Sequence, residues 1–239
     1  FLFIIEDKVS IFLNSSGNSL SKRGYREKIH KASLNEALAS GIILLSGWKP
    51  GQSFYDPMCG SGTFCIEAAL IGRNIPAGYY RKGFAFQRWE HFDNRLWNQI
   101  ATEAREKIVH DRFPIIGYDN ISANIDLSRQ NSRRILIHNY IQFKKAELYD
   151  FKPEIPGVII INPPYGERLG EENELSDLYQ LMGDVLKTNC QDADAFILSG
   201  NMELAKHLRL QHQSKIPLKN GKIDCRLLHY PIRHGKYAD

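Results

Sequence analysis

The chain has 239 residues, of which 43% are hydrophobic and 24% are charged, and its formal net charge is +4. This length suits one large α/β domain, or one domain with a short appendage, and the composition is that of an ordinary globular protein. No apolar run reaches the roughly 20 residues that cross a bilayer, and the apolar start is too short for a signal peptide. We therefore expect a cytoplasmic protein without a membrane partner. The small positive charge permits a nucleic-acid partner without requiring one.

Neither the cysteines nor the histidines have the spacing of a metal site. Cys59, Cys65, Cys190 and Cys225 lack the paired arrangement typical of zinc sites, and the eight histidines are scattered. We interpret the cysteines as reduced residues of an intracellular protein, and we expect no bound metal.

The first 20 residues differ from the rest of the chain. One or two strands are expected within residues 1–13, most clearly over Val9–Leu13, and the polar residues 14–19 are typical of a turn. The chain does not begin with methionine. We expect a fragment in which residues 1–20 are the trailing strand and linker of an upstream domain, and residues 21–239 form the main domain.

A basic segment with a tyrosine in its middle, Ser21–Arg26, follows the turn. Arg23 and Arg26 suit contact with phosphate, and the ring of Tyr25 suits stacking on a base, so this segment is a candidate nucleic-acid contact. The alternative is a linker whose tyrosine packs on the next domain.

A helix is expected over Ser33–Ser46, because apolar residues recur there at helical spacing. Ser33 is a plausible N-cap, and Glu36, three residues later, completes a capping box. The capping box gives Glu36 a sufficient structural role.

The most informative stretch is a turn with two glycines between an apolar strand, Ser53–Tyr55, and a helix that reaches about Ile71. Gly60 and Gly62 allow positive φ and the close approach of a ligand to the backbone. The helix after Thr63 presents free amides at its N-terminus, where a carboxylate or phosphate can bind. An ordinary strand-to-helix turn is the alternative.

A long connection rich in glycine and aromatic residues spans residues 74–89. Because it exceeds the usual α/β connection, we expect a lid over the ligand or a surface for substrate. A helix is expected at about 93–109, followed by a strand over 113–119 that ends in Asp119. That carboxylate suits the ribose hydroxyls of a nucleotide-like ligand. It can also cap the helix expected at about 121–137.

A strand over 141–144 leads into a loop with Glu147, and the next strand, Gly157–Ile161, runs into the Asn-Pro-Pro-Tyr turn of residues 162–165. The two prolines stop strand pairing and stiffen this turn, which holds an amide and an aromatic ring at the carboxyl end of the strand. Ligands of open α/β sheets bind at that end. The alternative is a stiffened surface turn.

The remaining elements continue the alternation of helices and strands. A helix is expected over 175–188, a strand over 195–199, a helix over 202–208 and a hairpin from residues 214–218 and 225–230. This order predicts an α/β fold with a mostly parallel sheet and helices on both faces, which the closing hairpin makes mixed.

Four segments together resemble a class I S-adenosylmethionine-dependent methyltransferase that modifies an exocyclic amino nitrogen. More closely, they resemble the bacterial 23S ribosomal RNA guanine-N2 methyltransferases, in which the catalytic domain follows a THUMP RNA-binding domain. The resemblance covers nearly the whole chain and rests on residues 22–26, 34–39, 56–63 and 162–170. It implies a Rossmann-like, mostly parallel seven-stranded sheet with an antiparallel C-terminal hairpin, and it identifies residues 1–20 with the end of a THUMP-like domain.

The resemblance implies S-adenosyl-L-methionine as the cofactor. The glycine turn is expected to hold its methionine part, Asp119 its ribose hydroxyls and Glu147 its adenine. The cofactor-binding residues implied in this way are Asp56, Gly60, Ser61, Gly62, Thr63, Asp119, Glu147 and Asn162.

The resemblance also implies that Asn162, Pro163, Pro164 and Tyr165 are catalytic. An exocyclic amine is a poor nucleophile, because its lone pair is delocalised into the ring. The Asn162 side-chain oxygen and the Pro163 carbonyl can accept its two N–H groups and direct the lone pair at the methyl group, while Tyr165 stacks on the unpaired base. Such catalysis by positioning and electrostatics needs no metal. The expected substrate-binding residues are Arg23, Tyr25, Arg26, Tyr165 and Arg168.

The leading hypothesis is methylation of a guanine N2 in 23S ribosomal RNA, before or during large-subunit assembly, by a monomer. An adenine-N6 methyltransferase acting on DNA or RNA is the alternative, because such enzymes share the Asn-Pro-Pro-Tyr turn. A nucleotide-dependent oxidoreductase is disfavoured, since the glycine turn lacks the third glycine of the dinucleotide fingerprint. A non-catalytic RNA-binding module would leave the Asn-Pro-Pro-Tyr turn without a role.

Overall fold

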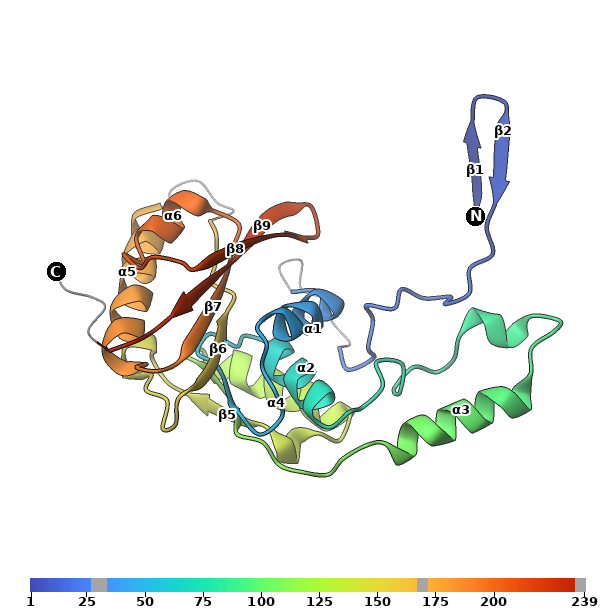
Figure 1. Ribbon diagram of the computed structural model, residues 1–239, viewed down its shortest axis with the longest axis horizontal. Helices are drawn as coiled ribbons and strands as arrows, with labels where there is room; N and C mark the ends of the chain where they lie inside the picture. Colours follow the sequence, from blue (N-terminus) through green and yellow to red (C-terminus); the bar gives the residue numbers. More distant parts are fainter. Residues whose placement is uncertain (27–33, 167–171, 235–239) are drawn as a thin grey trace.

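The computed structural model describes residues 1–26, 34–166 and 172–234. Two short antiparallel strands, β1 (Leu2–Ile5) and β2 (Lys8–Ile11), form an N-terminal hairpin whose residues are all exposed. Figure 1 shows this hairpin standing away from the rest of the molecule. The expectation of one or two strands within residues 1–13 is confirmed.

The central element is a seven-stranded sheet in the order β5-β4-β3-β6-β7-β9-β8. The first five strands of that order are parallel, and β9 and β8 join them antiparallel. The expected mixed sheet with a C-terminal hairpin is therefore confirmed. The strand bounds are β3 (Ser53–Asp56), β4 (Ile115–Asp119), β5 (Gln142–Lys145), β6 (Gly157–Ile161), β7 (Asp194–Ser199), β8 (Ser214–Asn220) and β9 (Ile223–Pro231).

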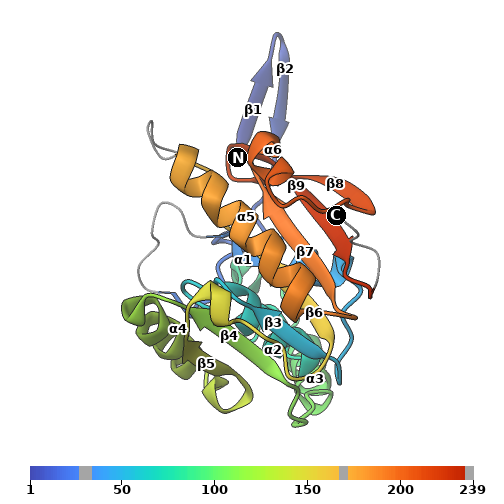
Figure 2. The same cartoon turned by 90° about the vertical axis from the view of Figure 1, so that its left-hand side faces the viewer.

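Helices cover both faces of the sheet, because alternate residues of the buried strands point to opposite sides. In β6, Val158 and Ile160 join the core under α1, α2 and α4, whereas Ile159 and Ile161 join the core under α5 and α6. Figure 2 shows α5 on one side of the sheet and α1 and α2 on the other. The helix bounds are α1 (Glu36–Leu45), α2 (Thr63–Gly72), α3 (Asn94–Glu106), α4 (Ser122–Arg134), α5 (Glu172–Asn189) and α6 (Met202–Lys206). None of these helices is long and apolar enough to cross a membrane.

The start of α1 differs from the expectation. Its N-cap is Asn35, whose Oδ1 accepts hydrogen bonds from the backbone N–H groups of Ala37 and Leu38, at 2.9 and 3.1 Å. Ser33, the expected N-cap, lies outside the described residues. The predicted cap was wrong because asparagine caps a helix as well as serine does. Glu36 is therefore the first residue of α1 and not the third residue of a capping box.

The long connection after α2 does not form a lid in this structure. Its aromatic rings pack on one another and on α3: Phe84 stacks on Phe86 with ring centroids 5.3 Å apart, and both contact Trp97. A short 3-10 helix, Ala85–Arg88, lies within it. Figure 1 shows the connection and α3 at the periphery, and the rings of Phe84, Phe86 and Trp97 are only partly buried and lie outside the two cores of the sheet.

Candidate functional site at the carboxyl ends of the parallel strands

A cavity of about 360 Å³ opens where β3 and β6 end. These two strands are neighbours in the sheet, and the connections from them run to opposite sides, which makes this the topological switch point. The volume lies within the range of roughly 300–1,000 Å³ that small-molecule sites occupy. Polar residues and turn residues that line it are Asp56, Gly60, Ser61, Thr63, Asn124 and Asn162. The connection of residues 74–89 does not contribute to its lining.

The glycine turn forms one wall of this cavity. Gly60 and Gly62 both have left-handed backbone conformations, with φ of 51° and 80°. A Cβ on Gly62 would also lie 2.9 Å from atoms of Phe143 and Ser128. Gly62 is the N-cap of α2 and provides no side-chain hydrogen bond to the helix. The first-turn amides therefore have no side-chain cap, which suits an anionic group in the cavity.

Asp119 ties the glycine turn to the start of α4. Its Oδ2 accepts a hydrogen bond from Gly60 N at 2.9 Å, and its Oδ1 accepts from Ile121 N at 2.9 Å and Asn124 Nδ2 at 3.0 Å. The carboxylate is buried and does not itself line the cavity, although Gly60 and Asn124 do. Asp119 thus holds the start of α4, as in the capping role expected from the sequence. It also supports the glycine turn.

Asp56 is the buried acid of the cavity wall. It is 2% exposed and accepts a hydrogen bond from Met58 N at 3.2 Å. Burial raises the pKa of this carboxyl to about 8, and the negative charge of Asp119 adds to the shift. A cationic ligand beside Asp56 would favour the ionised carboxylate. The chemistry of this wall therefore fits the sulfonium and ammonium charges of S-adenosylmethionine.

The Asn-Pro-Pro-Tyr turn forms the other side. Asn162 lines the cavity, and the Tyr165 hydroxyl donates a hydrogen bond to its Oδ1. The ring of Tyr165 lies against Gly200, where a Cβ would be 3.0 Å from both Tyr165 Cδ2 and Ile223 Cγ2. Tyr179 Oη donates to the Pro164 carbonyl at 3.3 Å. These contacts, from α5 and from the residue that follows β7, hold the turn at the cavity edge.

Glu147, the third acid expected at the cofactor, lies at the carboxyl end of β5. It is half-buried and accepts a hydrogen bond from Asn120 Nδ2 at 3.3 Å. It is not part of the cavity wall. The sheet order nevertheless places it on the same edge as Asp56 and Asp119.

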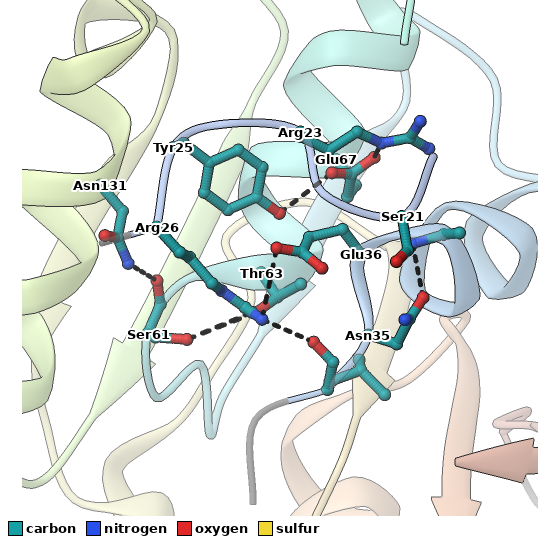
Figure 3. A network of polar contacts seen from close by, with 12 residues as sticks. Ser21, Arg23, Tyr25, Arg26, Asn35, Glu36, Ser61, Thr63, Glu67 and Asn131 are labelled. Atoms are coloured by element: carbon teal, nitrogen blue, oxygen red, sulfur yellow. Dashed lines mark hydrogen bonds and ion pairs between the residues drawn. The ribbon is translucent and has the colours of Figure 1, made fainter. Parts of the chain in front are cut away.

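The basic segment does not lie open for nucleic acid. Figure 3 shows Tyr25 and Arg23 directed at Glu67 of α2, and Arg26 directed at the glycine turn. Tyr25 is fully buried, and its hydroxyl donates to Glu67 Oε1 at 3.0 Å. The expected stacking of Tyr25 on a base is therefore wrong for this structure, since no ring surface is exposed. The alternative, a tyrosine packed on the following domain, describes the arrangement.

The arginines of that segment are also held inside the molecule. Arg23 Nε lies 3.6 Å from Glu67 Oε2, and Arg26 Nη1 donates to the Leu34 carbonyl at 2.8 Å. Both side chains are buried, which leaves little of either free for phosphate contact. Arg168, the remaining expected substrate contact, lies outside the described residues.

Two asparagines of α4 contribute to the site without having been expected. Asn124 lines the cavity, and Asn131 Nδ2 donates to the Ser61 carbonyl at 3.0 Å from a buried position. Together with the buried Ser128 they stand at positions i, i+4 and i+7 of the helix. This helical periodicity of small polar residues was a signal in the sequence that one face of α4 meets a polar site.

Within the described ranges, no three His, Cys, Asp or Glu side chains come together as a group that could hold a metal ion.

Comparison with known proteins gives one matching family model. The family described as "RMKL-like, methyltransferase domain" matches residues 23–229. A relative named ribosomal RNA large subunit methyltransferase K/L, from Syntrophotalea carbinolica, is 37% identical over 248 residues, which cover 99% of this chain and 35% of the relative. The chain spans between about a third and 60% of the length of the curated relatives it matches.

Two solved structures are closely similar. SMU.472, provisionally named a methyltransferase and solved in complex with SAH, has a TM-score of 0.90 at 35% identity, covering 98% of this chain and 62% of that one. A Listeria monocytogenes protein, described as a predicted N6-adenine-specific DNA methylase, has a TM-score of 0.86 at 34% identity, covering 96% of this chain and 59% of that one.

Proposed function

Since the chain belongs to the RMKL-like methyltransferase domain family, we propose that it methylates the exocyclic N2 amino group of a guanine in 23S ribosomal RNA. S-adenosylmethionine is the cofactor of this family, and SAH, the product left after methyl transfer, is bound in the similar SMU.472 structure. The family and cofactor expected from the sequence are thereby confirmed. What we propose beyond the family and the cofactor is the modified base (guanine), the methylated atom (N2) and the substrate (23S ribosomal RNA).

The observation that carries the proposal is the position of Asn162 at the cavity, directly after β6. S-adenosylmethionine supplies, when bound, an electrophilic methyl group on its sulfonium. Asn162 Oδ1 and the Pro163 carbonyl are oxygen acceptors on one rigid turn, so they suit the two N–H groups of a planar amine. Accepting both bonds orients the nitrogen lone pair towards the cavity, and this positioning is the main catalytic contribution.

The cofactor would be held by the residues around the cavity. We propose that the uncapped first turn of α2 receives its carboxylate, and that Asp56 faces its positive charges. Asp119 and Glu147 would serve the ribose and adenine at the ends of β4 and β5. The full proposed set is Asp56, Gly60, Ser61, Gly62, Thr63, Asp119, Glu147 and Asn162.

The substrate proposal draws on the relatives and on the Asn-Pro-Pro-Tyr turn. A relative with 37% identity is named as a large-subunit ribosomal RNA methyltransferase. Tyr165 is partly exposed beside Asn162, so its ring is available to a base that has left its stack. We propose that the domain acts as a monomer in the cytoplasm, on RNA before or during subunit assembly.

The domain boundaries form part of the same proposal. The family model starts at residue 23, and the hairpin of β1 and β2 is fully exposed. We propose that residues 1–20 are the trailing end of a THUMP-like domain and that residues 21–239 are the catalytic domain.

The test is methyl transfer from labelled S-adenosylmethionine to unmodified large-subunit ribosomal RNA and, in parallel, to duplex DNA, followed by nucleoside analysis. We expect N2-methylguanosine from the RNA and none of this product with Asn162→Ala. The Asn162→Ala variant should bind SAH more weakly but still measurably in calorimetry, because the glycine turn and the rest of the proposed cofactor site are intact. A wild-type protein that binds neither SAH nor S-adenosylmethionine would contradict the methyltransferase proposal.

Adenine-N6 methylation is the second candidate. The similarity to the Listeria protein, whose name is that of an adenine-specific DNA methylase, favours it. The same acceptors would hold the adenine amine. N6-methyladenine in the nucleoside analysis would select this candidate over the first.

A further inference from the structure

Arg26 joins the basic segment to the glycine turn. Its guanidinium donates to Thr63 Oγ1 and, at 3.5 Å, to Ser61 Oγ. Those two hydroxyl oxygens lie 3.4 Å apart, and both residues line the cavity. The Arg26 side chain is only 6% exposed and stands behind the turn, as Figure 3 shows.

The guanidinium dictates how these hydroxyls can hydrogen-bond. A guanidinium has only donors, so Ser61 and Thr63 must accept from it. Each hydroxyl then has a single proton to donate, and in this structure one of the two hydroxyls donates its proton to the other at 3.4 Å. The neighbouring positive charge also strengthens that proton as a donor. When an anion lies at the N-terminus of α2, both hydroxyl protons can turn towards it, because the guanidinium already donates to each oxygen.

Arg26 is fixed in this role by its own contacts. Nη1 donates to the Leu34 carbonyl at 2.8 Å and lies 3.7 Å from Glu36 Oε1. Its Nε is buried and has no acceptor among the residues that the structure describes. The preceding residue, Tyr25, is anchored to Glu67 on α2. The guanidinium is thus held against the turn and keeps unused donor capacity.

The two sides of the cavity differ in their chemistry. Asp56 provides an acidic wall at the end of β3, and Arg26 lies behind Ser61 and Thr63. A ligand that carries a carboxylate at one end and a positive charge near its centre matches this polarity. The methionine part of S-adenosylmethionine has both.

We propose that Arg26 is the positioning residue for the cofactor carboxylate: it acts through the Ser61 and Thr63 hydroxyls, which it orients as donors towards the cavity. This inference rests on the proposed cofactor site and replaces the RNA-contact role first expected for Arg26. It gives the basic segment a role in the methyl-donor site.

The experiment measures, by calorimetry, the affinity for SAH and for its decarboxylated analogue, S-adenosyl-3-thiopropylamine. We compare wild type with Arg26→Gln and Arg26→Lys. Loss of a charge-assisted interaction predicts SAH binding about 10- to 100-fold weaker in Arg26→Gln, with the analogue changed by about threefold or less. Arg26→Lys keeps the charge but loses the planar fork, so its loss should be intermediate.

The matched control is Arg73→Gln. Arg73 is a buried arginine at the opposite, C-terminal end of α2, where it donates to the Val109 carbonyl at 3.1 Å. Its loss should lower stability and leave the ratio of the two affinities unchanged. Circular dichroism verifies that each variant is folded. If Arg26→Gln does not fold, the comparison with wild type is made with Arg26→Lys.

A fall in SAH affinity alone supports the proposal. Equal losses for SAH and the analogue, or no loss for either, would overturn it and leave Arg26 with a merely structural role. Unchanged SAH binding with weaker RNA binding would restore the RNA-contact role. Failure of the wild type to bind either compound would refute the proposed function itself, an outcome distinct from these.

Discussion

The carboxylate of Asp119 accepts a hydrogen bond from the backbone N–H of Gly60, with 2.9 Å between Oδ2 and N. The two residues are 59 positions apart in the chain, at the ends of neighbouring strands. This bond fixes the glycine turn from behind, and the same carboxylate accepts from Ile121 and Asn124 at the start of α4. The shape of the cavity wall therefore depends on one buried acid.

Replacing Asp119 by asparagine should weaken both the fold and ligand binding. An amide cannot accept all three hydrogen bonds, because one of the two oxygens becomes a donor group. We expect the free energy of unfolding to fall by about 1–3 kcal/mol and SAH affinity to decrease. Urea denaturation and calorimetry measure the two effects. For stability alone, Glu147→Gln is the control, since Glu147 is half-buried and accepts one hydrogen bond of 3.3 Å. A larger loss of stability in Glu147→Gln than in Asp119→Asn would contradict the prediction.

Asp56 should make the protein less stable as the pH rises towards 8. Its folded-state pKa of about 8 lies above the usual 3.8, so between these values the unfolded chain releases a proton that the folded chain retains. The contribution of Asp56 to the free energy of unfolding is fully present below about pH 4. Above that pH it falls by roughly 1.4 kcal/mol per pH unit, and it stops falling near the folded-state pKa.

The Asp56→Asn variant isolates this effect. Its amide does not titrate and can still accept from Met58 N, so its stability relative to wild type should increase from pH 5 to pH 8 and then level off. Urea denaturation of both proteins across this range measures the difference, and Glu67, whose pKa burial raises to about 7, contributes equally to both. Parallel stability curves would show that Asp56 is ionised in the folded protein.

Tyr165 should be replaceable by phenylalanine but not by alanine. If the ring stacks on the target base, removing it costs about 1–3 kcal/mol, which lowers kcat/KM for RNA by about 5- to 150-fold. Tyr165→Phe keeps the ring and loses only the hydroxyl that donates to Asn162. Steady-state methyl transfer with both variants measures this. Equal losses in the two variants would assign the role to the hydroxyl instead.

Gly200 should be required for the position of Tyr165. A Cβ there would lie 3.0 Å from the Tyr165 ring and from the Ile223 side chain, so Gly200→Ala must shift the ring or that side chain by a few tenths of an ångström. We expect methyl transfer to fall while SAH affinity is unchanged, because the glycine turn lies elsewhere.

The control for that variant is Gly41→Ala within α1, where a Cβ meets nothing within 4 Å. It should leave transfer unchanged and stabilise the protein by about 1 kcal/mol, since glycine is unfavourable inside a helix. Calorimetric SAH binding and single-turnover transfer compare the two variants. Full transfer by Gly200→Ala would refute the positioning role.

The strands and most helices could be predicted because their signals are local. The buried run Gly157–Ile161 and the alternation of helices with strands led to the sheet that the structure has. The cap of α1 was missed because Ser33 and Asn35 are both good capping residues, and only the hydrogen bonds to Ala37 and Leu38 distinguish them. Glu36 likewise has an arginine partner that lies ten residues before it.

The role of the basic segment could not be predicted, because it depends on burial. Tyr25 and Arg23 look like nucleic-acid contacts when taken as residue types. Their partner, Glu67, is 42 residues after Tyr25 and points at it only because α2 packs beside this segment. No local pattern marks Glu67 as a buried acceptor.

By itself, the sequence determined the order of strands and helices, the two turns at the carboxyl ends of β3 and β6, and the family. The spacing of apolar residues and the positions of glycine and proline are local signals, because each depends on the backbone geometry of only a few neighbouring residues. They can therefore be interpreted without a structure. Only the tertiary structure decided that Asp119 supports Gly60, that Asn124 and Asn131 face the site, and that Arg26 lies behind Ser61 and Thr63. Those relationships join residues 35 to 70 positions apart or lie on a helix face whose orientation is set by packing, and long-range packing is not encoded in any short segment.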